Sequence, residues 1–169
     1  MGLLKQTFLH HSSHGLAIEL KAAMTSRLEI LSASLAAKLY EAPLIKQRLA
    51  CVAACELATK KARVENPLVV NALGQLRNGH VFTPQEKAEI DAIVAQLDDE
   101  YFNLQEEAEA GGVSAEDYLR VFAKARAIAA ISFAGSKEKA ALAEAIYEAA
   151  AAVGSDKAEL FSYVDAALK

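Results

Sequence analysis

The sequence predicts an all-α protein, a single compact bundle of about six to eight helices spanning residues 1–169. Apolar residues recur every three or four positions through most of the chain, the spacing of one helix face. No alternating run of β-branched residues has the length of a strand, and all three prolines stand where a helix would begin. Because 53% of the residues are hydrophobic and none is Trp, we expect a core built mainly from Ala, Leu, Ile and Val.

The first expected helix is marked by a stripe of long apolar side chains. Its members are Leu16, Leu20, Met24, Leu28, Leu31, Leu35 and Leu39. Ser26 followed by Glu29 matches a capping box, so one long helix and two collinear helices both fit the pattern. The stripe would serve equally as part of an intramolecular core or as the seam of a homodimer. Residues 1–12 are expected to form a flexible or docking segment, with contact to a membrane as the alternative.

Prolines mark the starts of the next two helices. Pro43 fixes the first turn of a helix that closes with Lys60, Lys61 and Arg63, because cations suit a helix C-terminus. Pro67 opens a further helix, which is expected to end near the turn at residues 78–79.

Residues 83–86 give the clearest helix start in the chain. Thr83 can cap, Pro84 takes the first helical position and Glu86 can return a bond to Thr83. This helix is expected to run to the glycine pair at residues 111–112.

The C-terminal third predicts three more helices. Ser114 with Asp117 opens one that ends near Gly135, residues 137–153 form an Ala-rich helix, and a turn at residues 154–156 leads into the last.

One-sided charge is the most informative feature of the chain. No basic residue lies between Lys87 and Arg120, whereas ten carboxylates do. Residues 1–64 carry nine Lys and Arg against four Glu, and residues 65–169 carry nine against eighteen Asp and Glu. Either the two halves neutralise each other within the fold, or the acidic segment meets a positive partner. Nucleic acid is excluded as that partner, because its phosphates would be repelled.

Six of these carboxylates form the predicted binding surface. They are Asp91, Asp98, Asp99, Glu100, Glu106 and Glu107. They fall into three pairs seven residues apart, so each pair lies near one stripe of a helix with a separation of about 10 Å. That separation suits an extended basic protein partner. A divalent cation, which would need ligands from another helix, and a purely solvated face are the alternatives.

A second potential site combines histidine and cysteine. His10 and His14, and likewise Cys51 and Cys55, are four residues apart, a spacing that would allow a Cys2His2 zinc site. The competing interpretation makes the cysteines core residues, because they lie in an Ala-rich run. The zinc interpretation would also make a metalloenzyme conceivable.

Catalytic motifs are missing from the sequence. Residues 74–79 have the glycine spacing of a P-loop, but His80 and Val81 replace the required Lys and Ser or Thr. We therefore expect a protein that acts by binding rather than by catalysis. The chain shows no convincing targeting signal and no apolar run of membrane-spanning length, which predicts a cytoplasmic protein.

Parts of the chain resemble TerB-like tellurite-resistance domains. The resemblance rests on the Ala-rich residues 50–55, the turn and helix start at residues 78–87, and residues 127–130 and 137–148, and it covers roughly residues 49–169. That family is all-helical and pseudo-duplicated, and it is associated with metal-linked stress responses. The resemblance therefore implies a divalent-cation-binding stress-response protein as the alternative to a protein-binding role.

Overall fold

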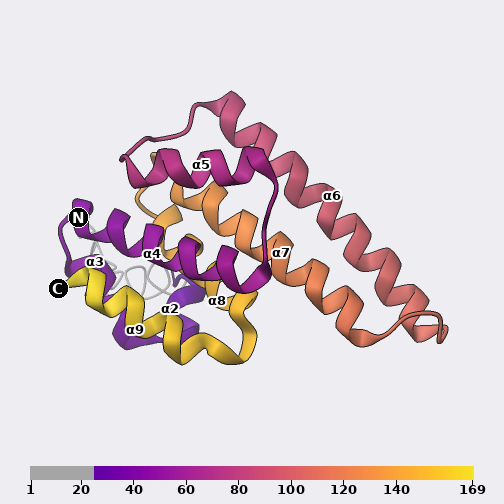
Figure 1. The fold of residues 1–169 in the computed structure, drawn as a ribbon. Coiled ribbons are helices and arrows are strands. Elements are labelled where there is room, and N and C mark those ends of the chain that lie inside the picture. Colours follow the sequence, from indigo (N-terminus) through magenta and orange to yellow (C-terminus); the bar gives the residue numbers. More distant parts are fainter. Residues whose placement is uncertain (1–24) are drawn as a thin grey trace, which may run out of the picture.

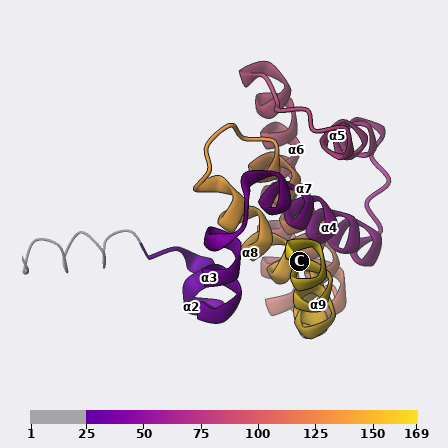
Figure 2. The same cartoon turned by 90° about the vertical axis from the view of Figure 1, so that its left-hand side faces the viewer.

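The computed structural model describes residues 25–169, and this part of the chain is a helical bundle without strands (Figures 1 and 2). The all-α prediction is confirmed. The helices are α2 (Arg27–Leu31), α3 (Ala33–Glu41), α4 (Leu44–Ala62), α5 (Pro67–Arg77), α6 (Pro84–Glu109), α7 (Ala115–Ala134), α8 (Ala141–Val153) and α9 (Lys157–Leu168), with a 3-10 turn, η1 (Gly154–Asp156), before the last.

Two short helices, rather than one, carry the described part of the leucine stripe. The Ser26 hydroxyl accepts a hydrogen bond from the Glu29 N–H at 3.2 Å and starts α2. The backbone becomes extended at Ser32, which caps α3 in the same way through Leu35. Both helices turn leucines inward, and Leu28, Leu35 and Leu39 are buried. The earlier members of the stripe and the expected docking segment at residues 1–12 lie outside the described residues.

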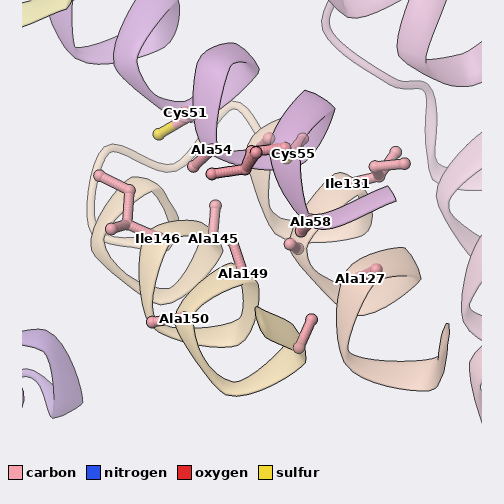
Figure 3. Close-up of a cluster of buried hydrophobic side chains, with 14 of the residues drawn as sticks. Cys51, Ala54, Cys55, Ala58, Ala127, Ile131, Ala145, Ile146, Ala149 and Ala150 are labelled. Atoms are coloured by element: carbon pink, nitrogen blue, oxygen red, sulfur yellow. The ribbon is translucent and has the colours of Figure 1, made fainter. Parts of the chain in front are cut away.

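The core lies where α4, α7 and α8 meet, and small side chains dominate it (Figure 3). Ala54 and Ala58 of α4 face Ala145 and Ala149 of α8, and all four are fully buried. Such small side chains let helix axes approach closely. Figure 2 shows α8 between α2 and α3 on one side and α4 and α9 on the other, so this Ala-rich helix is the centre of the body.

The Ala-rich helix begins later than the sequence suggested. We expected it to start at Lys137, but α8 begins at Ala141. Residues 137–140 are all exposed and lack an apolar side chain large enough to hold a further turn against the core. Ser136 instead accepts a hydrogen bond from the Glu138 N–H at 3.1 Å, which stabilises a non-helical turn.

Helices α6 and α7 form a long antiparallel hairpin whose far end extends beyond the body (Figure 1). The capping box at Thr83 and Glu86 is present, as predicted, and starts α6. The hairpin turns at Gly111, whose positive φ of 82° favours glycine. Ile90 near the base is the one buried residue among the 26 of α6, so the far half of this helix is largely surface.

Candidate binding surfaces on the hairpin

The six predicted carboxylates of α6 divide into two groups with different surroundings. Asp91 and Asp98 face α7, where side chains of that helix contact them. Asp99, Glu100, Glu106 and Glu107 are exposed and form no ion pair with any described residue. The pairs Asp99–Glu106 and Glu100–Glu107 thus lie on the exposed surface of α6, whereas the Asp91–Asp98 pair belongs to another site.

The first group belongs to a polar cleft near the base of the hairpin. Asp91 accepts hydrogen bonds from Lys87 at 2.6 Å and from the Ser132 hydroxyl at 2.5 Å. Asp98 receives both of its bonds from Arg126, at 2.5 and 2.7 Å. The cleft has a volume of about 320 Å³, and its wall includes Glu148 of α8.

Glu148 is the centre of an ion-pair network behind this cleft. Its side chain is only 3% exposed, and its two oxygens accept bonds from Arg27 at 2.6 Å and from Arg126 at 3.2 Å. Arg27 also pairs with Glu144 at 2.6 Å and lies 4.2 Å from the ring centre of Tyr147. Because buried carboxylates are stable only when paired, the network links α2, α6 and α7 to the central helix α8. Its carboxylates are occupied by arginines, which leaves little capacity to hold a metal ion.

The sequence analysis missed Arg27, Arg126 and Glu148. A signal was present, because Arg126 and Glu148 interrupt apolar Ala-rich runs in their helices. A charged side chain on the buried face of a helix requires a partner from another element. The sequence does not say which element supplies it.

The second group forms a surface that we call the acidic face: Asp99, Glu100, Glu106 and Glu107, together with the aromatic ring of Phe102. Residues 99, 102 and 106 share one stripe of α6 by helical spacing. Phe102 is 59% exposed, so much of its ring is open to solvent. Its ring contacts Tyr101 edge-on, with ring centres 5.2 Å apart.

An aromatic cluster beneath this surface fixes its position. Tyr101 contacts Tyr118 and Phe122 of α7, with ring centres 5.9 and 5.4 Å apart. Arg126 reinforces the same junction through its bonds to Asp98. The acidic face is thus mounted on a hairpin whose two helices are joined by aromatic packing and by the ion pair between Arg126 and Asp98.

The tip of the hairpin carries further negative charge. A hydrogen bond from the Ser114 hydroxyl, at 3.0 Å, lowers the pKa of Asp117 below its ordinary value, and the Ser114 N–H adds to this effect. Asp117 is paired with Arg120 at 3.0 Å, whereas the nearby Glu109 and Glu116 form no ion pair with a described residue.

Cys51 and Cys55 are core residues. Both are at most 1% exposed, and burial raises the pKa of Cys51 to about 12 and that of Cys55 further above its ordinary value. The Cys51 thiol donates to the Leu142 carbonyl at 3.3 Å, so it is protonated and hydrogen-bonded within the core. A zinc ligand would have to be a thiolate. His10 and His14, the other half of the predicted zinc site, lie outside the described residues.

The described part of the chain contains no group of three or more His, Cys, Asp and Glu side chains suited to a metal ion. Nor do its helices include one with both the length and the apolar character required to cross a bilayer. Comparison with protein-family models, curated proteins and solved structures found no match for this chain. The fold and surfaces thus define a helical bundle with a charged, aromatic-centred hairpin, and the TerB-like resemblance stays a prediction.

Proposed function

We propose that this protein acts without catalysis, by binding a basic protein partner through the acidic face on the far half of α6. The observation that carries the proposal is the state of its four carboxylates. Asp99, Glu100, Glu106 and Glu107 have no cation partner among the described residues, whereas Asp91 and Asp98 are paired. The face therefore projects a negative potential that would attract a positive surface and increase its association rate.

Phe102 supports a protein partner over a small cation. Aromatic side chains surrounded by polar groups are typical anchors of protein interfaces, where they supply most of the binding energy once water is excluded. A hydrated metal ion would gain nothing from an exposed ring. The position of Phe102 on the same stripe of α6 as Asp99 and Glu106 thus favours a partner that combines Lys or Arg with an apolar pocket or side chain.

The mounting of the face also suits recognition. The aromatic contacts of Tyr101 and the Arg126–Asp98 pair hold α6 on α7 before any partner arrives. A preordered helix loses little conformational entropy on binding, which improves affinity for a given contact area.

A synthetic helical peptide rich in Lys and Arg, with Leu at one face, is a direct probe. We expect fluorescence anisotropy to show binding that weakens steeply as salt is added. The triple variant Asp99→Lys, Glu100→Lys and Glu106→Lys should abolish the binding, and Phe102→Ala should weaken it about tenfold, equivalent to about 1.4 kcal/mol.

The matched control reverses three exposed acids elsewhere: Glu41→Lys, Glu65→Lys and Glu138→Lys. It changes the net charge by the same amount but leaves the acidic face intact. If the control weakened peptide binding as much as the acidic-face variant, attraction would depend on net charge alone and the proposal would fail. A calcium-induced rise in Tm that the acidic-face variant removes would instead favour the cation-binding alternative.

A further inference from the structure

A second surface, which includes basic side chains, lies where the C-terminal end of α4 meets α7. It is a cleft of about 620 Å³, lined by Lys61, Ala62, Arg63, Glu116, Leu119, Arg120, Ala123 and Lys124. Its lining carries four cations and a single carboxylate, and three further carboxylates, Asp117, Asp156 and Glu159, pair with two of these cations. The volume is within the usual range of sites for small molecules.

Two of the four cations are free to meet a ligand. Lys61 is held by Asp156 and Glu159, at 3.0 and 2.7 Å, and Arg120 is held by Asp117. Arg63 and Lys124 form no ion pair with a described residue. Lys61 and Arg63 would suit a helix C-terminus without any ligand, but Lys124 stands in the middle of α7, where no helix end explains it.

The backbone conformation of Arg63 is a second unusual feature of this cleft. Arg63 ends α4 with φ and ψ both at 53°, and it is the one residue other than glycine with positive φ in the described part of the chain. This left-handed position normally holds glycine or asparagine, because a larger side chain crowds the backbone. Arg63 therefore takes a backbone conformation that usually favours glycine, and its side chain lies on the wall of this cleft.

We propose that this cleft binds the phosphate group of a small phosphorylated molecule, with Arg63 and Lys124 contacting the phosphate oxygens. A doubly charged phosphate matches two free cations better than a single carboxylate does, and guanidinium binds phosphate through paired hydrogen bonds. Leu119, which is 54% exposed, and its neighbour Ala123 offer an apolar wall for the organic part of the ligand. Glu116 would repel a second anionic group, which favours a ligand phosphorylated at one end.

Phenyl phosphate is a suitable probe because it joins one phosphate to one apolar ring. We expect a titration followed by amide NMR shifts to place it at residues 61–63 and 116–124, with higher affinity than inorganic phosphate or benzoate. The double variant Arg63→Gln with Lys124→Gln should weaken binding at least about tenfold. Glu116→Gln should tighten it about threefold by removing the nearby negative charge.

The control Lys137→Gln with Lys139→Gln makes the same change in charge on the exposed turn before α8. Arg63→Gly separates function from folding, because glycine suits the left-handed backbone. This variant should bind phenyl phosphate more weakly, while its Tm should not fall. Equal losses in the control, benzoate bound as tightly as phenyl phosphate, or binding unchanged in Arg63→Gly would each overturn the assignment. Preferential binding to vesicles containing phosphatidic acid would also overturn it, by assigning the cleft to a lipid headgroup. None of these variants alters the acidic face, so the basic-peptide assay reports independently on the proposed function.

Discussion

Helices α8 and α6 treat their charged residues in opposite ways. Nine of the 13 residues of α8 are buried, and its two carboxylates, Glu144 and Glu148, are both paired with arginine. One of the 26 residues of α6 is buried, and its far half carries carboxylates without partners. Helix α8 therefore carries charge only where an opposite charge meets it, whereas the far end of the hairpin presents charge to solvent. Stability should depend on the first region, and recognition should depend on the second.

Removing the centre of the ion-pair network should cause the largest loss of stability. Glu148→Ala would leave Arg27 without one partner and Arg126 beside a newly emptied space. Breaking a buried ion pair from one side typically costs about 3–5 kcal/mol, and Arg27 retains Glu144, so we expect about 3 kcal/mol. Urea unfolding followed by circular dichroism measures this loss.

Glu107→Ala on the acidic face is the matched control for that experiment. Its side chain is exposed and makes no ion pair with a described residue, so its effect should lie within about 0.5 kcal/mol. Comparable losses in the two variants would contradict the division between body and hairpin.

The joint between the two regions should be nearly as sensitive. Gly135 ends α7, and its carbonyl accepts a hydrogen bond from the Phe82 N–H at 2.8 Å, just before α6 begins. A Cβ at Gly135 would lie 1.9 Å from the nearest atom of the Phe82 ring, so the buried ring would have to move. We expect Gly135→Ala to cost about 2 kcal/mol, since overpacking typically costs about 1–3 kcal/mol. Thermal unfolding measures it.

Gly74→Ala provides the comparison, because a Cβ there meets nothing within 4 Å and Gly74 lies inside helix α5. Alanine is the better helix former, so this variant should be stable or slightly stabilised. A Gly135→Ala variant as stable as Gly74→Ala would show that the Phe82 ring relaxes freely.

The sequence predicted the helices well where local signals decide them. The capping box at Thr83, the proline starts and the inward-facing Leu28, Leu35 and Leu39 all depend on residues close together in the chain, and the structure contains each. The first three members of the leucine stripe lie outside the described residues. The start of α8 was wrong, because whether residues 137–140 continue a helix depends on the core they would have to reach. The acidic segment was also visible, but its division into paired and unpaired carboxylates depends on Arg126, which lies 28 residues after Asp98 and meets it only in the folded hairpin. Arg63 and Lys124 are separated still further, so no spacing rule could have joined them into one cleft.

Acid should weaken the stabilising effect of two carboxylates with lowered pKa values, one in each region. The hydrogen bond from His80 lowers the pKa of Glu86 from an ordinary 4.5 to about 2, with help from Thr83, and Lys38 lowers that of Asp165 to about 2. The pKa of each carboxylate is lower in the folded protein than in the unfolded chain. Each carboxylate therefore stabilises the fold when the pH is above its unfolded-state pKa, and this contribution is lost as the pH falls toward 2. The difference in stability between the wild type and Glu86→Gln should therefore shrink between about pH 5 and pH 2, as measured by urea unfolding across that range.

Asp165→Asn is the counterpart on α9, where Lys38 and Lys169 pair with the carboxylate. Its difference from the wild type should shrink over the same interval. If the difference in stability from the wild type grew on acidification in either variant, the pKa of that carboxylate would have to be higher in the folded protein than in the unfolded chain.

The smallest effect on stability should come from neutralising the acidic face itself. Asp99→Asn, Glu100→Gln, Glu106→Gln and Glu107→Gln together remove four negative charges crowded on two turns of α6, and no described cation loses a partner. Relief of like-charge repulsion should leave the fold unchanged or raise its free energy of unfolding by a few tenths of a kcal/mol, more so at low salt. The same variant should no longer bind the basic peptide. Differential scanning calorimetry at two salt concentrations, beside the anisotropy assay, tests both statements. A clear loss of stability would mean that these carboxylates stabilise the fold. The contrast between α8 and α6 would then reflect two ways of stabilising helices rather than a division between folding and recognition.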